Sequence, residues 1–365
     1  MSSKDPHKEI PQDRDFTGGM IHSQSCAFIG STGEKALDDK IVKLAAEISG
    51  EQDCLLAEMM ITAVRTSRGS VTEGDYKLMN RSLKEMRIAN EVFYPYRHQQ
   101  KVAVFGSART DPEEPEYKAA VEFSEKMRDA GFMTITGAGP GIMAAGNEGA
   151  GREHSFGLDI SLPFEASANA FIDGDEKLID FDYFFTRKLS FVKEADAVAA
   201  FPGGFGTMDE IFETLTLIQT GKAAIYPLVL VDAKGGKYWK FWQQFIVEHL
   251  SRLKLISDDD FHLYMVTDDV DEAVAEVVKF YSTFHSYRYC GDRLVMRLKK
   301  KLSDEKMKSL TKEFGDIIKS GEFEQCGPLP EEANEPRLAE LPRLVFRHRR
   351  RNFGRLRKFI DAIND

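Results

Sequence analysis

From Lys101 to Phe284 the sequence alternates short apolar runs with longer amphipathic runs. A short apolar run bounded by glycines is typical of a buried strand, and an amphipathic run of ten or more residues is typical of a helix. Strands that alternate with helices form a parallel sheet covered on both faces. The sequence therefore predicts a Rossmann-like, doubly wound α/β fold, whose ligand lies outside the carboxyl ends of the strands.

The expected strands of this region are short and apolar. They cover residues 102–105, 132–136, 158–162, 178–182, 197–201 and 227–231. The expected helices cover residues 114–130, about 142–149, 186–194, a run ending at Thr220, a run containing Trp239 and Trp242, and 270–284. Each glycine-rich turn follows a strand, so the turns should converge on one crevice.

The regions on either side have a different composition. Residues 1–20 are polar with two prolines and predict a flexible tail, and residues 21–98 predict a helical extension that packs on the main domain or on another subunit. We expect the catalytic domain over 99–285 and a small, basic α+β appendage over 286–365. The appendage's expected elements are a strand at 293–298, a capped helix from 303 to 318, a strand at 344–346 and a helix at 355–363.

Composition narrows the class of protein. The net charge of −10 over 365 residues argues against a general nucleic-acid coat. No window approaches the roughly 18–20 apolar residues of a membrane span, and no apolar leader is visible at the N-terminus. The four cysteines are scattered without zinc spacing or a disulfide framework, namely Cys26, Cys54, Cys290 and Cys326. We therefore expect a cytoplasmic protein with no metal, no cofactor, no nucleic-acid partner and no membrane partner.

The stretch from Phe201 to Glu213 holds three glycines between an apolar run and an amphipathic run. A strand, a glycine turn and a helix N-terminus make an anion site, because the first N–H groups of the helix are unpaired and the macrodipole is positive there. Glycines allow a phosphate to approach the backbone. Glu210 is unexpected in such a turn, since a carboxylate repels phosphate unless it faces another part of the ligand.

A purely structural interpretation of the same residues is equally open from spacing alone. Thr207 and Glu210 fit a capping box, in which the threonine is the N-cap and the glutamate bonds back to its N–H. Capping does not account for Pro202 and the glycines before Thr207. Arg187, in the run before the strand, can present donors to a phosphate or form an ordinary surface pair.

Other motifs compete for the function. Gly137-Ala-Gly-Pro-Gly141 with Asp159 resembles a dinucleotide fingerprint, but it reads G-x-G-x-G and follows the second strand of the unit. A P-loop is excluded, because no G-K-[ST] follows either glycine cluster. No lysine has a distinctive setting for pyridoxal phosphate. The arginine cluster at 347–358 could bind an anionic effector, although a basic surface balancing acidic neighbours is the simpler interpretation.

The pair of motifs Phe185-Thr-Arg-Lys188 and Pro202-Gly-Gly-Phe-Gly-Thr-Met-Asp-Glu210 resembles the signature of the LOG ("Lonely Guy") family, often mislabelled lysine decarboxylases. The family pattern is R-K, a spacer, and then P-G-G-x-G-T-x-x-E. Similarity extends over roughly 100–285, including Phe105–Arg109, Thr136–Met143, Leu162–Phe164 and Leu217–Gly221. One departure is Ala138, where the family more often has glycine.

The resemblance implies a Rossmann-like oligomer, usually a dimer, that hydrolyses the N-glycosidic bond of nucleoside 5′-monophosphates to free base and ribose 5-phosphate. The flanking extensions place the chain near the long bacterial type. By motif, Arg187 and Glu210 are the expected catalytic pair. The expected substrate-binding residues are Gly106, Ser107, Gly137, Gly139, Lys188, Gly203, Gly204, Gly206 and Thr207. The runner-up is a nucleotide-sensing or nucleotide-carrying protein with the same crevice and no turnover.

Overall fold

The structure is a computed structural model that describes residues 30–49, 54–161, 168–333 and 335–365. The expected tail at 1–20 and the similar segment Leu162–Phe164 lie outside these residues. The chain divides into two compact units, one formed by Met20–Lys84 and the other containing Glu85–Asp365. The candidate site residues all belong to the second unit.

Within the described residues, seven parallel strands form one sheet in the order β4-β3-β2-β1-β5-β6-β7. Their bounds are β1 Lys101–Phe105, β2 Met133–Thr136, β3 Ser155–Ile160, β4 Leu178–Phe181, β5 Ala197–Ala200, β6 Leu228–Val231 and β7 Met265–Thr267. The predicted Rossmann-like sheet is confirmed. The order runs outward in both directions from β1 and β5, so the topological switch point lies between these two strands.

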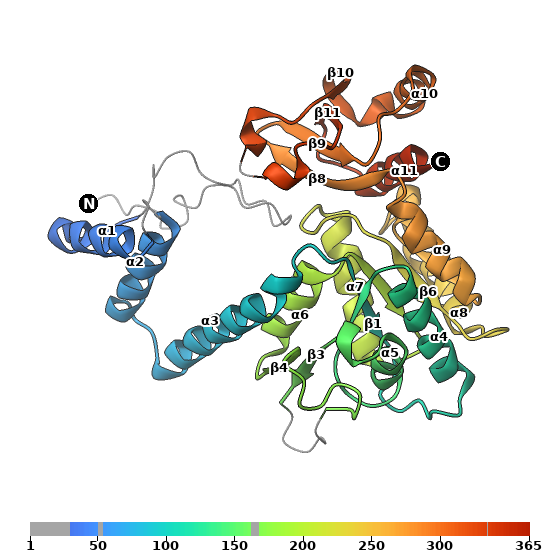
Figure 1. Ribbon diagram of the computed structural model, residues 1–365, viewed down its shortest axis with the longest axis horizontal. Helices are drawn as coiled ribbons and strands as arrows, with labels where there is room; N and C mark the ends of the chain where they lie inside the picture. Colours follow the sequence, from blue (N-terminus) through green and yellow to red (C-terminus); the bar gives the residue numbers. More distant parts are fainter. Residues whose placement is uncertain (1–29, 50–53, 162–167, 334) are drawn as a thin grey trace. The chain divides into compact units, whose positions relative to one another are not determined.

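Helices connect the strands. They are α4 Pro115–Asp129, α5 Ile142–Ala150, α6 Phe184–Glu194, α7 Phe205–Gln219, α8 Tyr238–Phe245 and α9 Val270–Phe280. Shorter 3-10 turns are η2 Tyr94–Tyr96, η3 Arg152–His154 and η5 Asp258–Leu263, and α8 continues into a π-helical turn, η4 Ile246–Ser251. Helices α4, α5 and α9 pack together on one face, where α4 and α9 lie side by side (Figure 1).

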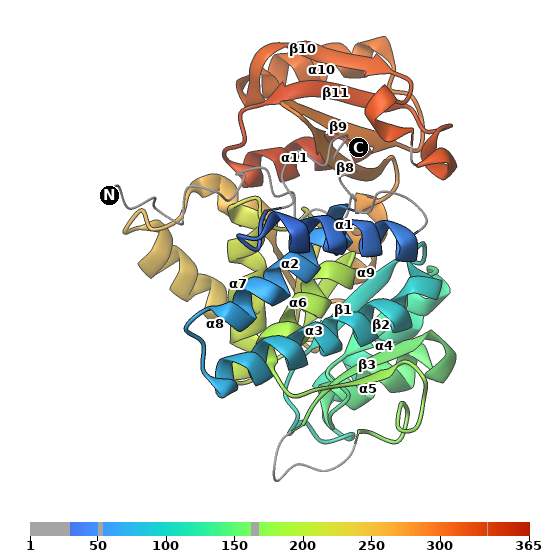
Figure 2. The ribbon, with the colours of Figure 1, turned by 90° about the vertical axis from the view of Figure 1, so that its left-hand side faces the viewer.

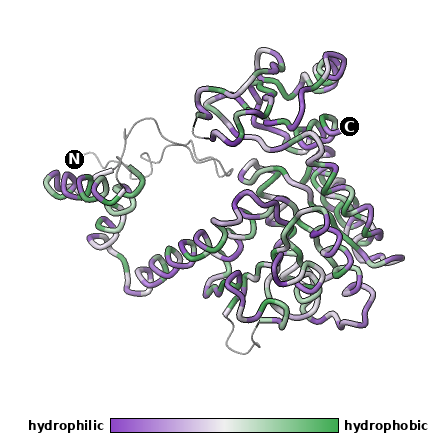
Figure 3. The backbone as a smooth tube through the Cα atoms, in the orientation of Figure 1, coloured by the Kyte–Doolittle hydropathy of each residue, from purple (hydrophilic) through white to green (hydrophobic). Residues whose placement is uncertain are grey.

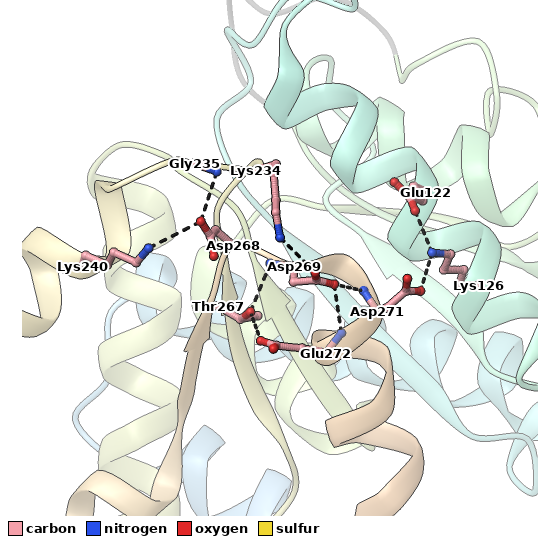
Figure 4. Close-up of polar contacts among 10 residues, drawn as sticks. All are labelled: Glu122, Lys126, Lys234, Gly235, Lys240, Thr267, Asp268, Asp269, Asp271 and Glu272. Atoms are coloured by element: carbon pink, nitrogen blue, oxygen red, sulfur yellow. Dashed lines mark hydrogen bonds and ion pairs between the residues drawn. The ribbon is translucent and has the colours of Figure 1, made fainter.

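The junction between β7 and α9 shows how these elements are tied together (Figure 4). Asp269 is the N-cap of α9, and its carboxylate accepts from Asp271 N at 2.9 Å. Lys126 of α4 contacts Asp271 Oδ1 at 2.5 Å, which joins α4 to α9. The sequence did not predict β7, because this strand has only three residues and two of them are half-exposed.

The N-terminal unit consists of α1 Lys35–Ser49, α2 Cys54–Arg68 and the first part of α3 Glu73–Phe93. Hydrophilic and hydrophobic residues alternate along α1 and α3, as in amphipathic helices (Figure 3). Among the described residues, the buried apolar side chains that form the core of α1 and α2 are Ile41, Ala45, Ala57 and Ile61. From Glu85 on, the expected extension belongs to the same unit as the α/β domain, whereas the packing expected of the residues before Glu85 stays a prediction.

One cysteine departs from the expected absence of disulfides. Cys54 is disulfide-bonded, whereas Cys290 and Cys326 are free thiols.

Four antiparallel strands form the C-terminal sheet, in the order β10-β11-β9-β8 (Figure 2). Its elements are β8 Phe284–Cys290, β9 Arg293–Leu298, α10 Asp304–Phe314, η6 Gly315–Ile317, β10 Ile318–Cys326, η7 Pro330–Glu332, η8 Pro336–Leu338, β11 Arg343–His348 and α11 Phe353–Asn364. The predicted α+β appendage is confirmed. Strand β8 was not predicted, because its first residue, Phe284, was expected to end the helix over 270–284, whereas α9 ends at Phe280. Strand β10 was not predicted, because its mostly polar sequence is held by pairing with β11.

The charges of this appendage are largely paired. The buried Glu332 carboxylate accepts from Arg343 Nε and Arg297 Nε, both at 2.8 Å, so neither buried arginine is left without a counter-ion. Other arginines of the basic cluster also have acidic partners, in the pairs Arg347–Asp292, Arg355–Asp316 and Arg357–Glu276. These pairs favour the interpretation of the cluster as a basic surface that balances acidic neighbours.

Helix α11 joins the appendage to the α/β domain. A Cβ added at Gly354 would overlap the carbonyl of Asp259 in η5, and one added at Gly221, after α7, would overlap the ring of Phe353. The Asn364 side chain accepts from Thr283 N at 2.9 Å. The appendage therefore packs against the domain through contacts that leave no room for a methyl group.

We predict that Gly354→Ala lowers the free energy of unfolding by about 1–3 kcal/mol, because the added methyl group forces α11 away from η5. Gly315→Ala is the matched control, since a Cβ at Gly315 meets nothing within 4 Å. Urea unfolding of both variants measures the difference. Equal stabilities of the two variants would show that α11 does not depend on this close contact.

No helix in the described parts of the chain is long and apolar enough to cross a membrane.

Candidate functional site

The loops that follow β1 and β5 meet at the switch point of the sheet. Ser107 N, after β1, donates to the carbonyl of Pro202, after β5, at 3.1 Å. A Cβ at Gly203 would overlap Thr207 and lie 3.0 Å from Ser107 N, and a Cβ at Gly106 would lie 2.6 Å from Ile142. Only glycine fits at Gly106 and Gly203. The turn after β1 and the turn after β5, which carry these predicted binding residues, therefore pack closely against each other.

Helix α7 begins directly after these turns. Its first residue is Phe205, and its N-cap is Gly204, with no side chain capping it. The capping box expected at Thr207 and Glu210 is therefore wrong, because the glycines let the chain enter the helix earlier and place Thr207 in the third helical position. A Cβ at Gly204 or Gly206 would meet nothing within 4 Å, so the first turn of α7 faces open space. Its N–H groups can bind an anion there.

The second glycine turn, after β2, packs against α6. A Cβ at Gly137 would overlap the Arg187 guanidinium and lie 2.6 Å from Met143 Sδ. Ala138 has a φ of 62°, a left-handed conformation that favours glycine. Gly139 lies at the same turn, where an added Cβ would be 2.6 Å from Met143 Cε.

Three polar side chains hold this turn in place. Asn169 Nδ2 donates to the carbonyls of Ala138 at 2.9 Å and Gly139 at 3.1 Å. It also contacts Asn147 Oδ1 at 3.0 Å, and Thr136 Oγ1 contacts the same oxygen at 2.7 Å. The network offsets the strain at Ala138 and fixes the wall against which Arg187 packs.

Lys188 of α6 contacts two acids of α7. Its Nζ lies 2.5 Å from Asp209 Oδ2 and 3.0 Å from Glu213 Oε2. Burial disfavours its charge, but these hydrogen bonds and the nearby charge of Glu210 raise the pKa of Lys188 above its usual value. Lys188, expected among the substrate-binding residues, thus lies at the α6–α7 contact with its charge shared by three carboxylates.

Glu210 projects from the second turn of α7 toward the sheet and α6. It borders a small pocket, whose other lining residues are Ala103, Phe105, Phe191, Val192, Val198, Thr214 and Tyr226. Burial against this mainly apolar wall raises the pKa of Glu210 to about 7, against the opposing charges of Lys188 and Arg187. The charges of Glu213 and Asp209 raise it further. The carboxyl group is therefore poised to gain or lose a proton near neutral pH.

The structure brings the two expected catalytic side chains close enough for their charges to interact, and it joins the turns that carry the expected binding residues. Two contributors were missed in the sequence. The Tyr238 hydroxyl donates to the carbonyl of Gly203, and Glu85 of α3 contacts the start of α6. Neither belongs to a motif, and only the fold brings them to the site.

No group of three or more His, Cys, Asp or Glu side chains in the described ranges could hold a metal ion. The site therefore offers three kinds of group: N–H donors for an anion, a carboxyl group with a raised pKa, and the two cations of α6. Together they can bind an anionic ligand and respond to charge that develops beside it.

Several solved structures resemble part of the chain, at low sequence identity and with low TM-scores. The molybdenum cofactor binding protein from Rippkaea orientalis is 18% identical with a TM-score of 0.36, covering 50% of this chain and 96% of that chain. The molybdenum cofactor carrier protein from Chlamydomonas reinhardtii is 19% identical with a TM-score of 0.34, covering 48% and 94%. DNA processing protein A from Helicobacter pylori is 14% identical with a TM-score of 0.36, covering 50% and 81%.

No curated protein matches the chain at a significant level. The family model described as "Possible lysine decarboxylase" matches residues 141–277, which include α6, β5, the glycine turn and α7. This segment contains the R-K pair and the whole of the P-G-G-x-G-T-x-x-E motif. Residues 141–277 are therefore a domain of the LOG family.

Proposed function

We propose that the protein hydrolyses the N-glycosidic bond of nucleoside 5′-monophosphates, such as AMP or N6-modified adenine ribotides, to free base and ribose 5-phosphate. One observation carries the proposal: a carboxyl group with a pKa of about 7, Glu210, lies one turn beyond the uncapped N-terminus of α7. The phosphate and the ribose of a nucleotide are adjacent, so one nucleotide could place its phosphate at the first turn of α7 and its ribose beside the Glu210 carboxyl group.

In this proposal the phosphate binds at the first turn of α7, where Gly204 and Gly206 leave the N–H groups accessible. Ser107 and Thr207 lie beside Gly203 at the base of the same turn. Fixing the 5′ end removes the translational and rotational freedom of the sugar relative to the protein. The ribose is thereby held over the second turn of α7.

Cleavage of a glycosidic bond passes through an oxocarbenium-like ribose. The Glu210 carboxylate beneath that sugar would stabilise the developing positive charge and bond its hydroxyl groups. Arg187 would keep the carboxylate ionised and offset the charge of the phosphate, as its effect on the Glu210 pKa suggests. We further propose that the protein acts as a homodimer or a larger homo-oligomer.

We predict that Glu210→Gln lowers the rate of base release on the order of 10²–10³-fold or more, because an amide cannot stabilise the cation. Nucleotide binding should persist, since the phosphate site lies one turn earlier. Chromatography of AMP, GMP and N6-modified ribotides incubated with each protein measures base release, and calorimetry measures binding.

Glu125→Gln is the matched control, because it makes the same change at an exposed carboxylate of α4 that lies outside the site. Unchanged base release in Glu210→Gln would contradict the assignment. Saturable nucleotide binding with no base release by the wild-type protein would favour the alternative, a nucleotide sensor or carrier.

We predict that kcat/KM rises with pH through about 7 and then levels off, because the ionised form of Glu210 is the active one and its pKa is about 7. Lys188→Met should move this rise to higher pH, since the Lys188 charge lowers the Glu210 pKa. The substrate phosphate also titrates near pH 6, but that titration is the same for both proteins.

Lys193→Met is the control for this shift, because Lys193 lies on the same helix and pairs with Glu194 instead. Initial rates from pH 5 to 9 give the midpoints. A midpoint that stays at the same pH in Lys188→Met, or a rate that falls as pH rises through 7, would rule out this role of the Glu210 carboxylate.

A further inference from the structure

Helix α6, which carries Arg187, begins without a cap of its own. Its N-cap residue is Tyr183, and no side chain at that position bonds to the first turn. The unpaired N–H groups of a helix start usually need a local acceptor, such as Ser, Thr, Asp or Asn. Contacts from other parts of the fold can hold such a helix start in place.

Glu85 of α3 makes such a contact, to the residue before the N-cap and to a side chain of the first turn. Its Oε1 accepts from Asp182 N at 2.9 Å, and its Oε2 accepts from the Thr186 hydroxyl at 2.5 Å. The residue is only 1% exposed. A carboxylate so deeply buried is stable only where donors compensate its lost hydration, and the positive end of the α6 macrodipole adds to that compensation.

The second part of α3 is firmly attached to the α/β domain. Glu85, Ala89 and Phe93 are its buried residues, spaced four apart on one face. The Phe93 ring stacks on Phe156 of β3 with centroids 4.4 Å apart. Glu85 is thus a polar residue in an otherwise apolar contact face, at the end that reaches the start of α6.

The position of α6 matters because Arg187 has little freedom on one side. Its guanidinium fills the space that a Cβ at Gly137 would need, against the turn held by Asn169. Thr186, the neighbour of Arg187 in sequence, is the residue that Glu85 holds. A tilt or rotation of the first turn of α6 would therefore move Arg187 relative to both Gly137 and Glu210.

We propose that Glu85 is a positioning residue: by bonding Asp182 N and the Thr186 hydroxyl at the start of α6, it fixes Arg187 between the Gly137 turn and Glu210. This inference rests on the proposed function, in which Arg187 acts beside Glu210. It assigns a role in the site to a residue outside the segment expected to form the catalytic domain.

Two substitutions separate positioning from charge. In Glu85→Gln, the amide oxygen can accept from Asp182 N, while the Thr186 hydroxyl accepts from the amide and donates to the carbonyl of Tyr183, 2.9 Å away. Glu85→Leu keeps a similar volume but supplies no acceptor. We expect kcat/KM to stay within a few-fold of wild type in Glu85→Gln and to fall about 10-fold or more in Glu85→Leu.

Phe93→Leu controls for lost stability, because it loosens the same face of α3 without touching the start of α6. A second readout needs no turnover: the pKa of Glu210, followed by the ¹³C shift of its carboxyl and assigned with Glu210→Gln. This pKa should be higher in Glu85→Leu than in the wild type, since a displaced Arg187 lowers it less. It should be unchanged in Glu85→Gln and Phe93→Leu.

An unchanged Glu210 pKa in Glu85→Leu would overturn the proposal, as would an equal loss of kcat/KM in Phe93→Leu. If the wild-type protein releases no base, the proposed function fails, while the titration of Glu210 still decides whether Glu85 positions Arg187.

Discussion

The reversal of strand order between β1 and β5 is the constraint on which the site depends. The two strands pair in parallel, but their continuations lead to opposite halves of the sheet, and ligands of such folds bind outside the carboxyl ends at this point. The hydrogen bond from Ser107 N to the Pro202 carbonyl draws the two loops together there. Gly203 permits this approach, and the same turn opens the first N–H groups of α7 to a ligand. Anion binding thus follows from the topology and from a few glycines.

The acidic half of the site depends on a balance of charges. Burial against Phe105 and Phe191 disfavours the Glu210 carboxylate, while Arg187 and Lys188 favour it. Lys188 itself is held by hydrogen bonds to Asp209 and Glu213. Helices α6 and α7 are therefore joined by alternating charges around one carboxyl group. These opposing effects give Glu210 a pKa near 7. Because the pKa depends on the distances to Arg187 and Lys188, a small movement of α6 or α7 would change the fraction of Glu210 that is ionised.

Much of the fold could be predicted because its strands are apolar runs followed by glycine, as in Val102–Phe105 and Ala197–Phe201. Strands β7, β8 and β10 could not be predicted, since they are held by pairing with neighbouring strands and are not marked by an apolar run in the sequence. The site divides in the same way. The R-K pair and the glycine motif located Arg187 and Glu210, but local spacing suggested a cap at Thr207 that the helix start at Phe205 excludes. The contact of Glu85 with Thr186 joins residues 101 positions apart, so no local sequence pattern predicts it.

The most direct test of the account compares AMP with adenosine as substrates of the wild-type protein. If phosphate at the start of α7 places the ribose over Glu210, the protein should release adenine and ribose 5-phosphate from AMP in equal amounts, and release adenine from adenosine at least about 10²-fold more slowly. Equal rates for the two substrates would show that the glycine turn does not position the sugar. Release of no base from any nucleoside monophosphate would contradict the assignment of the site to glycosidic hydrolysis.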